Sequence, residues 1–152
     1  MDKDAQYYVV CPVQYDEVCR RFIKEQQDGS AKQREDKALR SLIDALCIKV
    51  GIPIHIQGYA YICEAVQMVV YKPDIINRIT KDLYPGIADR FETSSSKVER
   101  SIRHAVSVLW QRGRVDAINQ VFGFTVCAHE KKLTNGEFIA LLANRCKSEW
   151  AS

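Results

Sequence analysis

The sequence has no long apolar run, and this absence excludes membrane-spanning proteins. No stretch approaches the roughly 18 consecutive apolar residues that a transmembrane helix needs. A secretory signal peptide, basic and then apolar, is also absent from residues 1–10. With 47% hydrophobic and 27% charged residues, the composition is that of a globular protein, and 152 residues suffice for one domain. We therefore expect a cytoplasmic protein with no membrane segment.

Motifs for metal binding, disulfide frameworks and catalysis are lacking as well. The cysteines form no C-x-x-C pair, and no histidine stands at zinc-finger spacing. No glycine-rich phosphate loop occurs, and nothing near Cys127 and His129 supplies an oxyanion hole. We expect free intracellular thiols that are mostly buried, no metal or cofactor, and no enzyme. The six cysteines are Cys11, Cys19, Cys47, Cys63, Cys127 and Cys146.

Alternating strand patterns are scarce, with residues 7–13 (YYVVCPV) as the one possible exception. Helical periodicity covers most other segments; in residues 33–51 it places an apolar stripe on one face. The sequence therefore predicts an all-α fold. Helix boundaries are indicated by Pro73 and Pro85 in first turns, by Gly51 and Gly123 at ends, and by Thr134 with Glu137 as a capping box.

A domain boundary is predicted near residue 33. Residues 24–36 (KEQQDGSAKQRED) are polar, contain a Gly-Ser break and carry no core residues, which is typical of a linker or loop. We expect residues 1–33 to form a short extension and residues 34–152 to form a helical domain. The extension is too small for a core of its own, so it either packs onto the domain or serves as an oligomerisation arm.

Positive charge is concentrated in one segment. The formal net charge is only +3, yet residues 94–114 hold five basic side chains against a single acid, Glu99. Such a stripe is typical of nucleic-acid binding, although it is also common on solvated helices. The basic residues are Lys97, Arg100, Arg103, Arg112 and Arg114.

The same segment has the pattern of a recognition helix, about Ser94–Gln111. A helical projection places Val98, Ile102, Ala105, Val106 and Leu109 on one face and Lys97, Arg100, Ser101 and His104 on the other. A short helix (YPGIADRF) and a polar break at residues 92–95 precede it, which is the order of a helix-turn-helix motif.

Each polar residue of this helix has a DNA-binding interpretation. Lys97 and Arg100 can donate to guanine and Glu99 can accept from cytosine, while Ser94, Ser95 and Ser96 can reach phosphate. The alternative is a solvated helix in an interaction domain, in which Ser96 and Glu99 form a capping box. The residues alone leave both interpretations open.

Four segments together resemble one family. They are IHIQGYAYICEAVQMVV, ITKDLYPGIADRF, SSSKVERSIRHAVSVLWQRG and FGFTVCAHEKKLTNGEFIALLA, which occur in order between about Leu39 and Ala151. They are similar to the C-terminal effector domain of the stage 0 sporulation response regulator, a transcription factor of endospore-forming bacteria. The resemblance implies about six helices around a helix-turn-helix, TGTCGAA-like DNA boxes, and head-to-tail dimers on tandem sites.

The resemblance also implies roles for individual residues. It makes Lys97, Glu99 and Arg100 the base-reading residues, and Arg103 and His104 contacts to the DNA backbone. It implies that the following helix touches the sigma subunit of RNA polymerase. The residues in that region are Arg114, Asp116, Asn119, Gln120 and Phe122.

Two departures from the family pattern bear on function. The family usually has arginine where this chain has Lys97, and lysine lacks the two-pronged fork of arginine, so discrimination at that base can differ. The first 33 residues are also too few for the family's phosphorylated receiver domain. We expect a sequence-specific DNA-binding regulator of transcription. The alternative is a protein-interaction module that modulates a sporulation regulator and has lost specific DNA binding.

Overall fold

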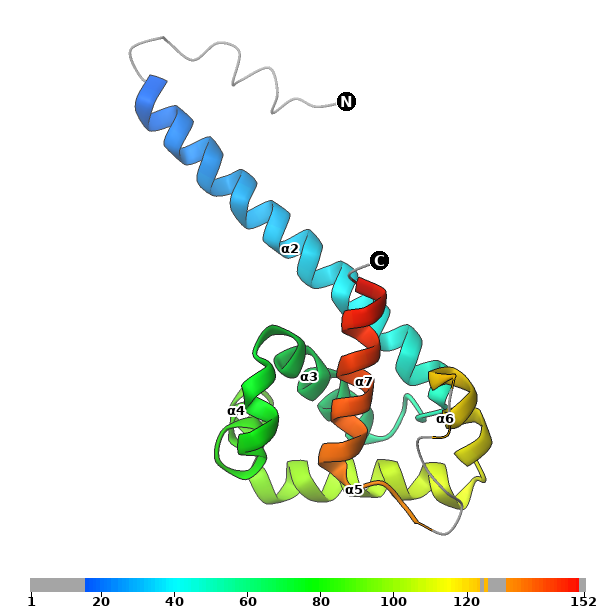
Figure 1. Ribbon diagram of the computed structural model, residues 1–152. Coiled ribbons are helices and arrows are strands. Elements are labelled where there is room, and N and C mark those ends of the chain that lie inside the picture. Colours follow the sequence, from blue (N-terminus) through cyan, green and yellow to red (C-terminus); the bar gives the residue numbers. More distant parts are fainter. Residues whose placement is uncertain (1–15, 124, 126–130, 151–152) are drawn as a thin grey trace. The chain divides into compact units, whose positions relative to one another are not determined.

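A computed structural model describes the backbone of residues 16–123, 125 and 131–150, and the side chains among these from residue 29 onward (Figure 1). The possible strand at residues 7–13 and the pair Cys127 and His129 lie outside the described residues. The chain divides into two units, Met1–Ala38 and Leu39–Ser152. The described part of the first unit is helical, and its side chains from residue 29 to 38 are almost all exposed.

Helix α2 spans Asp16–Val50, so the predicted loop at residues 24–36 is wrong. That stretch is polar but rich in lysine, glutamate, glutamine and arginine, which are good helix formers. The single Gly29 costs a helix only about 1 kcal/mol relative to alanine. The polar composition of this stretch therefore indicates a helix exposed to solvent, and not a loop between two helices.

The expected all-α fold is confirmed, and the described residues contain six α-helices. After α2 come α3 (Gln57–Tyr71), a 3-10 turn (Pro73–Arg78), a π-helical turn (Ile79–Leu83), α4 (Tyr84–Arg90), α5 (Ser95–Gln111), α6 (Val115–Phe122) and α7 (Asn135–Trp150).

Most predicted helix boundaries are confirmed. Gly51 follows the end of α2 with φ 99°, and Gly123 caps α6 in the left-handed region with φ 76°. Pro73 and Pro85 lie in the first turns of their helices. At the start of α7, the Thr134 hydroxyl accepts from the Glu137 amide at 3.2 Å and donates to its carboxylate at 3.1 Å. These residues act locally, which is why their spacing alone located them.

Helix α3 is the centre of the second unit, and it packs against α5 and α7 (Figure 1). Its side chains from Tyr61 to Val66 are buried without interruption, as expected for a helix that is apolar nearly all round. Near its start, a Cβ on Gly58 would lie 2.4 Å from the Ser101 carbonyl oxygen of α5. Only glycine permits this close approach, which fixes α5 against the core.

Candidate nucleic-acid interface

Helices α4 and α5 form the predicted helix-turn-helix. The seven-residue α4 ends at Arg90, and α5 begins at Ser95 after a turn of four residues. Ile87 and Ala88 of α4 are buried, and α4 packs on α5. The longer second helix is thereby placed with one face on the core and the other available to a partner.

The turn is closed by backbone hydrogen bonds. The Thr93 amide donates to the Ala88 carbonyl at 2.9 Å, and the Glu92 amide donates to the Asp89 carbonyl at 3.4 Å. This pair of bonds is a Schellman motif, with Glu92 in the left-handed position at φ 52°. The Phe91 ring packs edge-to-face on Tyr61 of α3, with centroids 5.2 Å apart. The turn is therefore held to the core as well as to α4.

Ser94 is the N-cap of α5. Its side chain accepts a hydrogen bond from the Lys97 backbone amide at 3.2 Å. The alternative capping box of Ser96 and Glu99 is therefore wrong, because the helix begins two residues earlier than that box requires. Ser96 is exposed on the side of α5 away from the core, whereas Ser95 is half-buried in the first turn.

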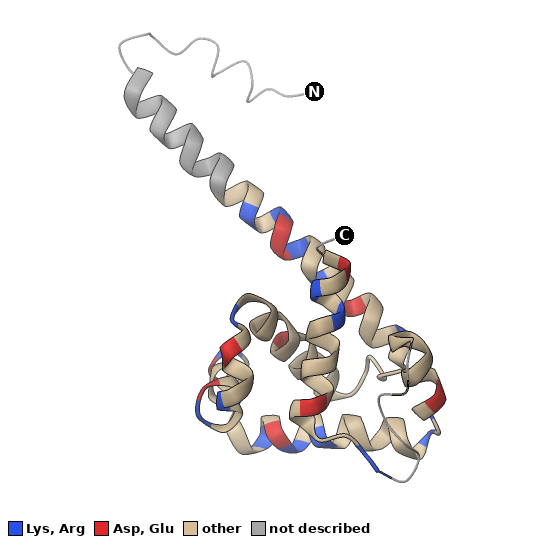
Figure 2. Cartoon of the chain, in the orientation of Figure 1, with Lys and Arg blue, Asp and Glu red and all other residues tan. Residues whose placement is uncertain are grey.

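The two predicted faces of α5 are confirmed. All five predicted apolar residues are buried, with 0% of their surface exposed. The opposite face carries the basic residues that run along this edge of the unit in Figure 2. The exposed residues of this face are Ser96, Lys97, Arg100, Arg103, His104 and Gln111, with Glu99 and Ser101 half-buried beside them.

Glu99 is engaged by neighbouring groups. Its carboxylate lies 3.2 Å from the Arg103 guanidinium one turn later, and its backbone carbonyl accepts from the Asn135 amide at 3.2 Å. Because both carboxylate and guanidinium reach solvent, this ion pair stabilises the fold by at most about 1 kcal/mol. Its effect is to orient the two side chains within the basic face.

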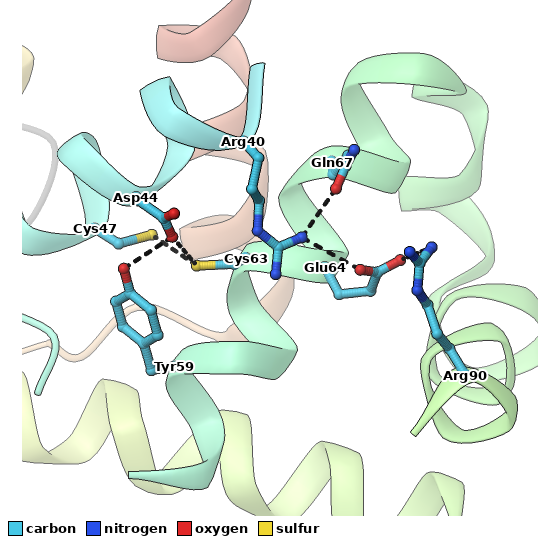
Figure 3. Close-up of polar contacts among 8 residues, drawn as sticks. All are labelled: Arg40, Asp44, Cys47, Tyr59, Cys63, Glu64, Gln67 and Arg90. Carbon is cyan, nitrogen blue, oxygen red and sulfur yellow. Dashed lines mark hydrogen bonds and ion pairs between the residues drawn. The ribbon is translucent and has the colours of Figure 1, made fainter. Parts of the chain in front are cut away.

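Beneath this surface lies a buried carboxylate that the sequence analysis missed. Glu64 of α3 is 3% exposed and lies between two arginines (Figure 3). Arg90, at the end of α4, contacts it at 2.9 Å, and Arg40 of α2 contacts it at 3.3 Å. Arg40 also donates to the Gln67 side chain at 2.9 Å. Glu64 therefore ties the first helix of the motif to α2 and α3. The only sequence signal was one acid inside the apolar run YICEAV.

A second polar cluster holds α2 to the start of α3. The Tyr59 hydroxyl donates to Asp44 Oδ1 at 2.9 Å, and the Cys63 thiol donates to the same oxygen at 3.5 Å (Figure 3). The sulfurs of Cys63 and Cys47 are 3.8 Å apart, which is a contact between free thiols. The expectation of free, buried cysteines is confirmed for Cys47, Cys63 and Cys146.

These surroundings raise several pKa values. The hydrogen bond with Cys63, together with burial, raises the pKa of the Cys47 thiol well above its ordinary value of 9.0. Burial raises the pKa of Cys146 to about 12. Burial and the hydrogen bond to Asp44 also raise the pKa of Tyr59. All three groups are therefore neutral at physiological pH and act as packing groups.

The residues expected to contact a sigma subunit fall into two groups on α6 and its N-cap. Arg114, Asp116 and Gln120 are exposed, and Asn119 is half-buried. Phe122 is only 7% exposed, because its ring packs in the core. Phe122 is thus unavailable to a partner in this conformation, whereas the polar residues present one surface.

Within the described residues, no helix is both long enough and apolar enough to cross a membrane.

The family described as "Sporulation initiation factor Spo0A C terminal" matches residues 43–146, well over half of the chain. The matched range contains the helix-turn-helix, the basic face of α5, and Glu64 with its partner Arg90. This chain therefore belongs to the Spo0A C-terminal family, which comprises DNA-binding regulatory domains of sporulation and is not a family of enzymes.

Proposed function

We propose that the chain is a sequence-specific transcription regulator that reads TGTCGAA-like boxes through the N-terminal half of α5. The observation that carries this proposal is the exposure of Lys97 and Arg100 in the first turns of the second helix of the motif. In helix-turn-helix proteins this part of the second helix meets base edges in the major groove. Arginine and lysine there donate to the O6 and N7 atoms of guanine.

The remaining polar residues of α5 supply the supporting contacts. Glu99 accepts from cytosine, and its ion pair with Arg103 sets the direction of its carboxylate. Arg103 and His104 lie one turn further along the exposed face and bind the backbone with Ser95 and Ser96. Ser94 contributes as the cap that fixes the start of the helix.

Further partners follow from the same assignment. Tandem boxes would seat two copies of the domain head to tail on DNA. The exposed residues Arg114, Asp116 and Gln120 provide a polar surface for the sigma subunit of RNA polymerase, separate from the DNA-reading residues. Phe122 supports that surface from within the core.

Fluorescence anisotropy with two labelled duplexes tests the assignment. One duplex carries two tandem TGTCGAA boxes, the other the same bases scrambled, and both are titrated across a salt series. We expect the boxed duplex to bind more than about tenfold more tightly, with affinity that falls steeply as salt rises. Arg100→Ala should weaken binding to the boxed duplex by about 1–3 kcal/mol, because a base contact is lost.

The matched control is Lys72→Ala, which removes an exposed positive charge at the end of α3. This variant should bind the boxed duplex like the wild type. Equal, weak binding of the wild type to both duplexes would contradict base reading. It would support the alternative, an interaction module that binds a sporulation regulator without specific DNA affinity.

A further inference from the structure

Two lysines far from α5 in sequence lie beside it in the fold. Lys131 and Lys132 are exposed and lie just before Leu133 and Thr134, which lead into α7. The Lys132 ammonium donates to the Ser107 hydroxyl of α5 at 2.7 Å. Leu133 is buried, and Thr134 caps α7, so the backbone on one side of Lys132 is anchored. The position of Lys132 relative to α5 is therefore set by the fold.

Half-buried Ser107 lies in line with the exposed basic residues of α5. It stands one turn beyond Arg103 and two turns beyond Arg100, on the same side of the helix. Lys132 thus adds a cation where the C-terminal half of α5 has none of its own before Arg112. In Figure 2 the basic residues before α7 lie beside α5, near its own basic residues. The positive surface is longer than the recognition helix alone provides.

Arg103 and Lys132 also line one groove between α5 and the start of α7. The groove has a volume of about 550 Å³, and Glu99, Thr134 and Asn135 are among its other lining residues. The two cations come from different elements, so they approach the groove from two sides. Lysine suits phosphate as a compact point charge, whereas base reading favours the planar fork of arginine.

The length of α5 determines what this surface meets on DNA. Lys97 and Ser107 are ten residues apart, or about 15 Å along the helix axis. The major groove is about 12 Å wide. A helix that crosses the groove with Lys97 and Arg100 at the base edges brings the part near Ser107 to a sugar–phosphate strand. A cation held there faces phosphate.

We propose that Lys132, with Lys131 beside it, is a second DNA-binding element that binds backbone phosphates flanking the bases read by α5. This inference rests on the proposed function. On this proposal, the protein contacts more of the DNA than the base-reading residues of α5 alone would contact. Two elements of the fold then share DNA binding. Lys97 and Arg100 supply specificity, whereas the lysines before α7 supply affinity without reading sequence.

The test compares Lys132→Gln and the double variant Lys131→Gln/Lys132→Gln with the wild type. Each protein is titrated with a boxed duplex that has long flanks, a boxed duplex trimmed close to the boxes, and a long scrambled duplex. On the long boxed duplex we expect Lys132→Gln to bind about fivefold to tenfold more weakly. The slope of log affinity against log salt should fall by about one for each lysine removed.

Two further readouts separate phosphate binding from base reading. The ratio of boxed to scrambled affinity should stay at the wild-type value, and the difference between variant and wild type should shrink on the trimmed duplex. Lys72→Gln is the control for loss of one surface charge elsewhere. Thermal melts of all variants should match the wild type, because the substituted side chains are exposed.

Each contrary result is distinct. If the wild type prefers the boxed duplex but both lysine variants keep its affinity and salt slope on long flanks, the second element is disproved while the proposed function stands. If Lys132→Gln lowers the boxed-to-scrambled ratio instead, the lysine reads bases and the phosphate assignment is wrong. If the wild type shows no preference at all, the proposed function fails and this inference fails with it.

Discussion

Charged residues occur in two contrasting settings on neighbouring helices. On α5, Lys97 and Arg100 are exposed on a helix whose other face is buried. On α3, Glu64 is buried and is contacted by Arg40 and Arg90. The exposed charges cost the fold little and remain available to a binding partner. The buried charge is committed to holding α2, α3 and α4 together. Position within the fold, more than residue type, separates charge for binding from charge for structure.

The largest expected effect is on the buried charge. Glu64→Gln keeps the shape of the side chain but removes the charge that both arginines contact, so we expect the free energy of unfolding to fall by about 2 kcal/mol. Urea denaturation followed by circular dichroism measures this. Arg100→Ala is the matched exposed case and should leave the free energy of unfolding within about 0.5 kcal/mol of the wild-type value. An equal loss of unfolding free energy in both variants would contradict the distinction between buried and exposed charges.

Burial of the thiols makes the stability of the fold depend on pH. The pKa of Cys146 is about 12 in the folded protein, against an ordinary value of 9.0, and that of Cys47 is also raised. A raised folded pKa means that the folded state holds its proton more tightly. Above about pH 9 the thiols ionise in the unfolded chain but stay neutral in the folded protein. The stabilisation that they give is therefore complete below about pH 9. It is lost as the pH rises further, by up to about 1.4 kcal/mol per pH unit per thiol.

Thermal melts between pH 7 and pH 10.5 measure this loss, under reducing conditions. Cys146→Ala removes one of the titrating groups and should flatten the alkaline decline, although it also lowers stability at neutral pH by leaving a small cavity. A decline of unchanged steepness in the variant would show that Cys146 does not contribute.

The smallest effect distinguishes two serines that stand two residues apart. Ser94→Ala removes the cap of α5 and should lower the free energy of unfolding by about 1 kcal/mol. Ser96→Ala should leave stability unchanged and weaken DNA binding through one lost phosphate contact. Chemical denaturation and anisotropy, run on both variants, measure the two quantities. A stability loss confined to Ser96→Ala would place the cap where the capping-box spacing had suggested.

Local features of the fold were predictable from the sequence because they depend on neighbouring residues. Gly51, Gly123 and Thr134 marked helix ends through their own backbone preferences and short-range hydrogen bonds. The apolar stripe of α5 followed from helical spacing. The register of its cap did not, because Ser94 and Ser96 both suit the position and only packing selects between them.

Features built from distant residues were beyond such reasoning. Arg40, Glu64 and Arg90 meet although 24 and 26 residues separate Glu64 from its partners. Lys132 reaches Ser107 across 25 residues, so no spacing rule brings them together. The family resemblance predicted which residues of α5 read bases but carried no information on these contacts. Residues 24–36 show the opposite error, in which a polar composition was taken as a loop although its helix propensity was high.

The placement of α5, which carries the proposed DNA-reading residues, depends on Gly58 of α3. Any side chain at this position would collide with the α5 backbone at Ser101 and push the helix outward. The position of α5, the proposed DNA-reading helix, therefore depends on there being no side chain at Gly58. A genetic screen for loss of DNA binding would recover changes at Gly58 together with those at surface arginines, and only a structure explains why both belong in one class.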